Sequence, residues 1–337
     1  HRHQHPGEIQ GVEILEFGLL MDSQCIKDIA RSLGFSACGI APARNLPEAE
    51  ERFMHYLELG YQADRHFLER DIDKRFDPQE LLPGCRSVIV VTYNYLCDVE
   101  PVSDRYRTAR YTWIEDYHTL VKRMLEEMVA MMQRVGECRC RVTVDSSCIS
   151  EKNWAVEAGV ACYGKNGLVH NDDGSYFVIG TILSDVTVDS YDLPRKSDCG
   201  ECRLCVDKCP AKALDTPYRV DARRCFAYHT VENKNPDTEI LEKAPLLFGC
   251  DICQEVCPKN KKKSPNLTNV SKSSVFLRLQ NQGFENLSEE EFKTCFGNTA
   301  IARRKYERLY RAIQIKRLSL KNDHQRGREE RDSGLCQ

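Results

Sequence analysis

No part of the sequence resembles a membrane-spanning helix, because no stretch approaches the roughly 18–20 consecutive apolar residues that cross a bilayer. A secretory signal is also missing from the first residues. The apolar stretch 12–20 is short, contains Glu13 and Glu16, and follows no basic segment. We therefore expect a protein of the reducing cytoplasm that has no membrane attachment.

A strong charge of either sign is absent as well. The 48 lysines and arginines nearly balance 51 aspartates and glutamates, which gives a net charge of −3. A uniformly basic nucleic-acid-binding protein is therefore excluded, although a local basic surface is not. With 41% hydrophobic residues the chain can build a packed core, so global disorder is not expected.

Cysteine is abundant, with 18 residues in a chain of 337. In a reducing compartment, the spacing of cysteines is read as metal chemistry. The first run has the ferredoxin spacing C-x2-C-x2-C-x3-C followed by proline; its cysteines are Cys199, Cys202, Cys205 and Cys209. The second run is shorter and also ends in Cys-Pro; its cysteines are Cys250, Cys253 and Cys257. Structural zinc also uses C-x2-C pairs, but two runs that each end in Cys-Pro favour two 4Fe–4S clusters.

Two such clusters need one more ligand than the two runs supply, and Cys225 lies between them. In two-cluster ferredoxins the fourth cysteine of each run binds the other cluster. We therefore predict that one cluster is held by Cys199, Cys202, Cys205 and Cys257. The other is predicted to be held by Cys209, Cys225, Cys250 and Cys253. The remaining cysteines are interpreted as small buried hydrophobic residues.

Helix and strand patterns alternate through the first half of the chain, which predicts an α/β or α+β domain. Helices are expected over 22–33, 47–59, 116–135 and 150–158, and strands over 37–41, 87–95, 141–144 and 176–183. The methionine-rich face of helix 116–135 could line a cofactor, but a core face is the favoured interpretation.

The expected division of the chain has five parts. They are a disordered extension (1–21), the α/β domain (22–193), a two-cluster ferredoxin-like domain (194–262), a helical segment (263–320) and a disordered charged tail (321–337).

Short motifs spread in order over residues 22–320 resemble the epoxyqueuosine reductases, a cobalamin-dependent family of tRNA-modifying enzymes. Besides the two cysteine runs, the motifs are Gly34-Phe35, Gly39-Ile40-Ala41-Pro42, Phe67-Leu68, Arg75-Phe76-Asp77-Pro78, Leu81-Leu82-Pro83-Gly84, Ser87–Tyr95, Ala109-Arg110-Tyr111, Asp116-Tyr117-His118, Val144-Asp145, Gly164-Lys165-Asn166 and Gly180-Thr181-Ile182-Leu183, and the second run itself reads Gly249-Cys250-Asp251-Ile252-Cys253-Gln254. The resemblance implies an oxidoreductase that reduces epoxyqueuosine to queuosine at the wobble position of tRNA. Reduced cobalamin would perform the chemistry, and the clusters would supply it with electrons.

The same resemblance assigns site residues. Asp145 matches the family's catalytic acid, and to donate a proton near neutral pH it would need burial or a neighbouring carboxylate to raise its pKa. Tyr111, Tyr117 and His118 are candidates for the cofactor and substrate pocket, with His118 not expected to bind cobalt. Lys165 and Asn166 are candidates for holding the corrin or its nucleotide tail.

Each assignment has a structural alternative. Asp145 and His118 could cap a turn and a helix, and Lys165-Asn166 could be a surface turn. The family usually continues with Thr-Gly-Pro after this aspartate, whereas this chain has Ser146-Ser147-Cys148, so the geometry of the turn is open.

Two basic runs are candidates for phosphate contacts with the tRNA anticodon loop: Lys259, Lys261, Lys262 and Lys263, and then Arg303, Arg304, Lys305, Arg308 and Arg311. The family's longer members end in HEAT-like repeats, of which only a short part is expected here. A low-potential donor such as a flavodoxin or ferredoxin and a monomeric state are also expected. Two other functions stay open: a corrinoid reductase of another substrate, and an electron-transfer protein without a corrin.

Overall fold

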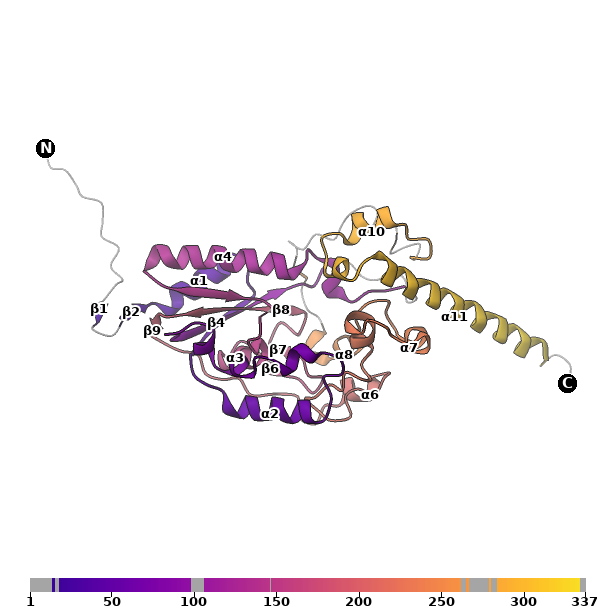
Figure 1. Ribbon diagram of the computed structural model, residues 1–337, viewed down its shortest axis with the longest axis horizontal. Helices are drawn as coiled ribbons and strands as arrows, with labels where there is room; N and C mark the ends of the chain where they lie inside the picture. Colours follow the sequence, from indigo (N-terminus) through magenta and orange to yellow (C-terminus); the bar gives the residue numbers. More distant parts are fainter. Residues whose placement is uncertain are drawn as a thin grey trace.

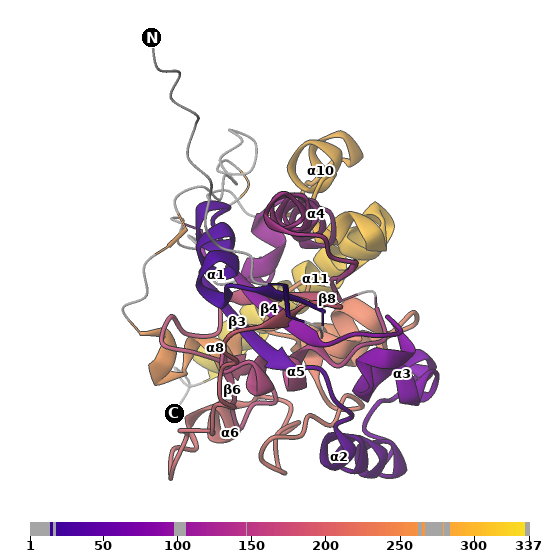
Figure 2. The same ribbon diagram turned by 90° about the vertical axis from the view of Figure 1, so that its left-hand side faces the viewer.

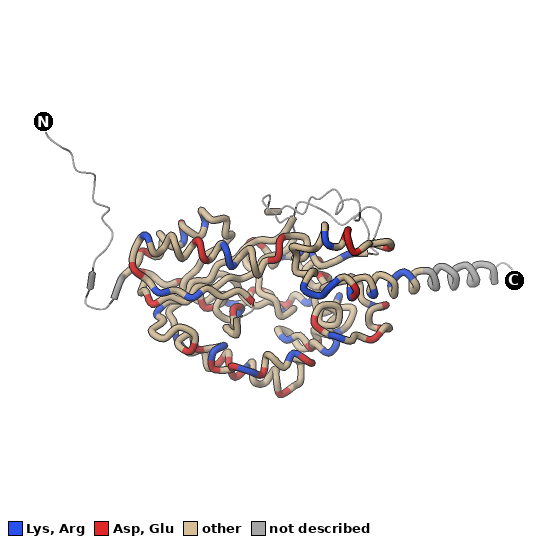
Figure 3. The backbone as a smooth tube through the Cα atoms, turned by 45° about the horizontal axis from the view of Figure 1, so that its top comes forward, with Lys and Arg blue, Asp and Glu red and all other residues tan. Residues whose placement is uncertain are grey.

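The computed structural model describes residues 14–15, 18–97, 106–145, 147–261, 265–266, 279 and 284–333. Ser146, Lys262 and Lys263, which figure in the sequence-based expectations, lie outside the described residues, as does most of the range 264–283. Among the described residues, no helix combines the length and the apolar character needed to cross a membrane. Basic and acidic residues are interspersed along the chain (Figure 3).

A four-stranded sheet forms the centre of the molecule, in the order β3 (Ala37–Pro42), β4 (Ser87–Asn94), β8 (Phe177–Ser184) and β5 (Cys140–Thr143). Every neighbouring pair is antiparallel. All four strands were expected from the sequence. The antiparallel pairing makes the domain α+β and rules out the parallel sheet that an α/β domain would have.

Helices cover both faces of this sheet, as Figures 1 and 2 show. Helices α1 (Ser23–Ser32) and α4 (Tyr117–Val135) pack on one face, and α5 (Glu151–Glu157) packs on the other, beside α2 (Pro47–Glu58) and α3 (Ile72–Phe76). Side chains of β4 alternate between the two layers, so that Ile89 belongs to one core cluster and Val90 to the other. A strand that is buried on both faces explains the nearly continuous apolar sequence of β4.

The methionine-rich face of α4 belongs to the core. Met128 and Met132 are completely buried against the sheet. Gly180 allows this close approach, because a Cβ atom there would lie 2.9 Å from a methyl carbon of Leu125. The interpretation of this face as core is confirmed.

The expected disordered extension over 1–21 is wrong for its described part. Residues Gly18–Met21 form β2, which pairs in parallel with β9 (Thr187–Val188) and antiparallel with β1 (Ile14–Leu15). Met21 is buried in the core cluster. Backbone pairing with a strand more than 160 residues away fixes this segment, and no local pattern could have indicated it.

Short elements surround the cysteine runs on the side of the sheet away from the N-terminus (Figure 1). They are β6 (Cys162–Tyr163), β7 (Val169–His170), α6 (Leu204–Lys208), η4 (Tyr228–Glu232), α7 (Thr238–Lys243), α8 (Ile252–Glu255) and η5 (Pro258–Asn260). Helices α6 and α8, which carry the two cysteine runs, pack together. The domain boundaries expected at 193 and 262 stay predictions.

The C-terminal part is helical, as expected, with α10 (Glu289–Phe296), η6 (Ala300–Arg304) and α11 (Tyr306–Ser333). Helix α11 continues through most of the segment expected to be a disordered tail, so that expectation is wrong up to Ser333. The reason lies in the sequence, since Lys, Arg, Glu and Gln are good helix formers and no proline interrupts them.

Candidate active site

Asp145 follows strand β5 at the edge of the sheet, and its backbone leaves the strand in a left-handed conformation with φ of 45°. Its N–H donates to Glu151 Oε1 over 2.7 Å, which ties this turn to the start of α5. The side chain keeps 58% of its surface exposed. Aspartate tolerates this conformation better than most residues. The turn therefore directs the carboxylate away from the sheet toward solvent.

The carboxylate of Asp145 is the end of a hydrogen-bonded chain that begins at the N-terminus of α4. Its Oδ2 lies 2.9 Å from His118 Nε2 and accepts from the Tyr117 hydroxyl, also over 2.9 Å. The other ring nitrogen of His118, Nδ1, lies 2.7 Å from Asp116 Oδ1. Tyr117 stacks on the imidazole ring at 4.1 Å. The structure thus brings together three predicted site residues, Tyr117, His118 and Asp145.

The capping role considered for His118 belongs to Asp116 instead. Asp116 accepts from the His118 backbone N–H over 3.2 Å at the first turn of the helix. The imidazole is therefore free to lie between two carboxylates.

The pKa pattern of this site differs from the expectation. The hydrogen bond from His118 lowers the pKa of Asp145, although burial opposes the shift. Burial lowers the pKa of His118, but the hydrogen bonds to Asp145 and Asp116 outweigh it and raise the pKa overall. The raised pKa that a donor near neutral pH would need is therefore not found at Asp145, because the hydrogen bond from His118 has the largest effect on this carboxyl.

Glu151 carries the raised carboxyl pKa instead. Burial, and then the charge of Asp145, raise the pKa of Glu151 to about 8. Next to it, burial lowers the pKa of Lys152, although the Lys152 side chain keeps exposed surface. The site therefore holds two groups that carry a proton near neutral pH, Glu151 and His118.

Tyr111 connects this site to the second cysteine run. It is half-buried, meets the Tyr117 ring edge-on at 6.2 Å and lies against Phe248 at 6.5 Å. The preceding backbone is bonded to the same run, since Ala109 N–H donates to the Phe248 carbonyl over 2.8 Å and Arg110 N–H donates to Asp251 Oδ2 over 2.7 Å. The predicted pocket residue Tyr111 thus lies between the second run and the Tyr117 side of the site.

Gly249 allows this contact. Its φ is +73°, and a Cβ atom there would lie 2.4 Å from the Cβ of Ala109. Only glycine accepts both the conformation and the close approach.

The eight predicted cluster cysteines fall into two groups. Burial raises the pKa of Cys205, and the charges of Cys199, Cys257 and Cys202 raise it further. In the second group burial raises the pKa of Cys253, followed by the charges of Cys250 and Cys225. The charge of Cys209 likewise contributes to the raised pKa of Cys250. The last cysteine of each run therefore acts electrostatically on a cysteine of the other run, and the two crossed ligand sets stay predictions.

The two groups differ in their surroundings. Cys202 is exposed, whereas Cys253 is buried enough to raise its pKa strongly and acts electrostatically on Lys152 of the Asp145 site. The second group is therefore the one beside the candidate active site.

The two residues predicted to hold a corrin, Lys165 and Asn166, make local contacts. Lys165 Nζ donates to the Gly200 carbonyl over 2.5 Å, and Asn166 Oδ1 accepts from Leu168 N–H over 3.2 Å within the β6–β7 turn. The turn nevertheless borders the site, because Lys152 Nζ donates to the Gly167 carbonyl over 2.8 Å. A cofactor contact by Lys165 and Asn166 stays a prediction.

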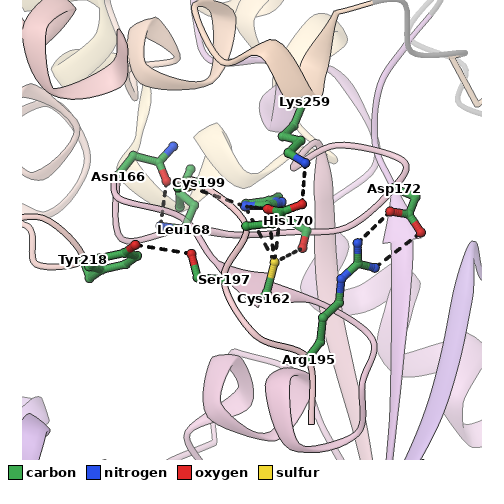
Figure 4. A network of polar contacts seen from close by, with 11 residues as sticks. Cys162, Asn166, Leu168, His170, Asp172, Arg195, Ser197, Cys199, Tyr218 and Lys259 are labelled. Atoms are coloured by element: carbon green, nitrogen blue, oxygen red, sulfur yellow. Dashed lines mark hydrogen bonds and ion pairs between the residues drawn. The ribbon is translucent and has the colours of Figure 1, made fainter. Parts of the chain in front are cut away.

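A polar network around the buried His170 and Cys162 lies beside the first cysteine group (Figure 4). The ring of His170 lies 3.8 Å from Cys162 Sγ, 3.4 Å from Asp198 Oδ1 and 3.9 Å from Cys199 Sγ. Lys259, one of the predicted RNA contacts, pairs with Asp198 on the outer side. This network fixes the surroundings of Cys199. It also holds Lys259 in an ion pair with Asp198, so the charge of Lys259 is neutralised within the protein.

Several arginines predicted to contact RNA are also engaged within the protein. Arg303 pairs with Asp116 over 2.8 Å and Arg304 with Glu232 over 2.6 Å. Arg308 and Arg311 donate to backbone carbonyls of Asn233 and Pro236. These contacts dock η6 and α11 against the cluster region, so RNA contact by these side chains stays a prediction.

Sequence reasoning missed four residues of the site: Asp116 as a partner of His118, Glu151, Lys152 and Arg303. The acidic residue before an expected helix was a signal for Asp116 as a cap. Nothing in the local sequence indicated the other three.

Comparison with known proteins gives a consistent result. Two family models match the chain: "Epoxyqueuosine reductase QueG, DUF1730" over residues 75–146, and "4Fe-4S double cluster binding domain" over residues 198–260. A curated epoxyqueuosine reductase of Cyclobacterium marinum is 35% identical over 303 residues, which cover 87% of this chain and 96% of the relative.

Solved structures agree. Epoxyqueuosine reductase from Streptococcus thermophilus superimposes with a TM-score of 0.77 at 26% identity, covering 88% of this chain and 80% of that one. An epoxyqueuosine reductase crystallised with an epoxyqueuosine-modified tRNA stem loop gives a TM-score of 0.75 at 25% identity, with 87% and 80% covered.

Proposed function

The chain belongs to the epoxyqueuosine reductase family, and we infer from this that it reduces the epoxide of epoxyqueuosine in tRNA to the alkene of queuosine. The reaction takes two electrons and two protons, breaks both carbon–oxygen bonds of the epoxide and releases the oxygen as water. The protein must therefore supply an electron path and a proton path that meet at the substrate.

One observation carries this proposal: the hydrogen-bonded chain that ends at Asp145 lies beside the second cysteine group. Tyr117 of that chain packs against Tyr111, whose segment is bonded to the second cysteine run, and Lys152 connects the Asp145 turn with Cys253 electrostatically. A simple electron carrier would not need proton-holding groups at this point. The arrangement therefore favours an enzyme over an electron-transfer protein, and the relatives give no support to a different corrinoid substrate.

For the protons, we propose that Asp145 contacts the departing oxygen and that His118 supplies the proton it delivers. The lowered pKa of Asp145 makes it a poor reservoir, whereas the raised pKa of His118 lets the imidazole hold a proton near neutral pH. Glu151, with a pKa of about 8, is the second proton-holding group, and it is bonded to the backbone of Asp145. Two such groups match the two protons that the reaction consumes.

For the electrons, the chain carries two 4Fe–4S clusters in the double-cluster domain. We propose Cys199, Cys202, Cys205 and Cys257 as ligands of the first cluster and Cys209, Cys225, Cys250 and Cys253 as ligands of the second. The exposure of Cys202 supports a first cluster that faces the donor, and the electrostatic effect of Cys253 on Lys152 supports a second cluster beside the active site.

The site also fits a corrin. Asp145 and Lys152 keep exposed side chains in desolvated surroundings, and both ring nitrogens of His118 are hydrogen bonded to carboxylates, so no imidazole here is free to bind cobalt. This agrees with the expectation that His118 does not bind cobalt. Reduced cobalamin would supply a strong nucleophile for the epoxide. Tyr111, Tyr117, Lys165 and Asn166 would border it, while Asp145 and His118 hold the proton.

The partner we propose is a tRNA anticodon loop carrying epoxyqueuosine, because a solved relative was crystallised with such a stem loop. A flavodoxin or ferredoxin donor, a monomeric state and a cytoplasmic location stay predictions from the sequence.

The decisive experiment is mass spectrometry of modified tRNA after anaerobic incubation with the cluster-loaded protein, cobalamin and a strong reductant. Loss of one oxygen from epoxyqueuosine is the expected result, and an unchanged nucleoside would contradict the function. An Asp145→Asn variant should lose turnover by about 10²–10⁴-fold while its cluster spectrum stays intact. Asp173→Asn, at an exposed turn aspartate, is the matched control and should keep full activity.

A further inference from the structure

We infer that Arg303 is a positioning residue for this reaction, which holds Asp116 so that His118 presents its Nε2 to Asp145. The inference rests on the proposed function. It gives the C-terminal helical segment a part in catalysis, in place of the phosphate contact that the basic sequence of η6 suggests.

The contact is short and is supported by a second one. Arg303 Nε donates to Asp116 Oδ2 over 2.8 Å, while the Asp116 N–H donates to the Asn298 carbonyl over 2.5 Å. Asn298 lies in the turn between α10 and η6, and Arg303 lies in η6 itself. This turn is anchored, because Ala300 and Ile301 are buried in the core. Asp116 and His118 are only 16% and 13% exposed, so their geometry is set by protein contacts.

With Arg303 in place, both oxygens of Asp116 are committed. Oδ2 accepts from Arg303, and Oδ1 accepts from the His118 backbone N–H and faces His118 Nδ1. A carboxylate held at both oxygens cannot turn about its Cβ–Cγ bond. The proton on Nδ1 is then fixed toward Asp116, and Nε2 points to Asp145 over 2.9 Å. Removing Arg303 frees one oxygen and allows the imidazole to turn away from Asp145.

Arg303 also sets the charge around His118. The ring contacts Asp116, the N-cap of α4, together with Tyr117 of α4 and Asp145 after β5. Behind these groups, Arg303 of η6 bonds to Asp116, Tyr111 of η3 (Arg110–Trp113) contacts Tyr117, and Glu151 and Lys152 of α5 act electrostatically on Asp145 or are acted on by it. Arg303 is the positive group bonded to Asp116. Its removal leaves the carboxylate more available to the imidazolium, so His118 should keep its proton to a higher pH.

The test compares Arg303→Gln, Arg303→Lys and the control Arg123→Gln in the cluster-loaded enzyme with cobalamin and modified tRNA. Arg123 is an exposed arginine of α4 that pairs with Glu115 over 3.1 Å, so it matches the charge and the location without touching Asp116. The measurements are kcat, KM for tRNA and the pH dependence of kcat.

For Arg303→Gln we expect a fall in kcat of about tenfold, a nearly unchanged KM and an alkaline limb of kcat that moves to higher pH. Arg303→Lys should recover part of the lost kcat and return the alkaline limb part of the way to its wild-type pH. Arg123→Gln should behave as wild type. A raised KM with unchanged kcat and limb would mean that Arg303 contacts RNA, and would overturn the inference. Equal behaviour of the glutamine variants at 303 and 123 would overturn it as well. Wild-type turnover in the same assay tests the proposed function separately.

Discussion

Replacing Gly249 by alanine tests whether the close contact beside the second cysteine group keeps the two parts of the site together. The new Cβ would lie 2.4 Å from the Ala109 Cβ, and Ala109 cannot move aside easily because its N–H is bonded to the Phe248 carbonyl over 2.8 Å. An alanine with φ of +73° costs about 1–2 kcal/mol, and overpacking adds about 1–3 kcal/mol. We therefore expect a loss of about 2–5 kcal/mol.

A matched control separates the two contributions. Gly200 lies in the first cysteine run with φ of +46°, and a Cβ atom there would meet nothing within 4 Å. Gly200→Ala should therefore show only the backbone cost, about 1–2 kcal/mol.

The assay is thermal unfolding of the cluster-loaded protein, followed by the loss of cluster absorbance, together with turnover at low temperature. At about 2 °C for each kcal/mol in a chain of this size, Gly249→Ala should lower the midpoint by about 4–10 °C. It should also reduce turnover, because Tyr111 follows the displaced segment. If Gly249→Ala is no less stable than Gly200→Ala, the packing argument at Ala109 is refuted.

Three further changes have defined outcomes. Cys225→Ala should remove the second cluster and leave the first, so that iron and sulfide fall by about half; retention of both clusters would remove Cys225 from the ligand set. Burial and Asp145 raise the pKa of Glu151 from 4.5 to about 8, so the folded state binds an extra proton in that window and loses stability as the pH rises through it. Glu151→Gln should therefore gain stability relative to wild type between those pH values, measured by urea unfolding, and an unchanged difference would contradict the raised pKa. Met128→Ala should cost about 2–5 kcal/mol in the same assay with unchanged cofactor content, because Met128 is a fully buried core residue.

The sequence predicted the parts of the fold that local patterns determine. The apolar run of β4, the buried stripe of α4 and the cysteine spacing all led to the observed elements. The direction of strand pairing was beyond reach, because β3, β4 and β8 carry the same pattern whether they pair parallel or antiparallel. The pairing of β2 with β9 was also beyond reach, because the two strands lie far apart in the sequence.

The site was predicted as far as the family resemblance named its residues. Asp145, His118 and Tyr117 indeed meet, but the sign of the pKa shift at Asp145 depends on which group donates to it. Arg303 was assigned to RNA because its charge is visible in the sequence, whereas its partner Asp116 lies 187 positions earlier. Such contacts follow from the tertiary fold and from no local pattern.

The grouping of Cys209 with Cys250, and of Cys205 with Cys257, has a consequence for how this region holds together. Once iron joins each group, the chain between the two runs becomes a closed loop of about 40 residues, and loop-closure entropy alone then disfavours the unfolded chain by about 4 kcal/mol per cross-link. The region thus gains from iron what small secreted proteins gain from disulfides. Iron starvation should therefore remove the folded platform under the active site, and not only its electrons.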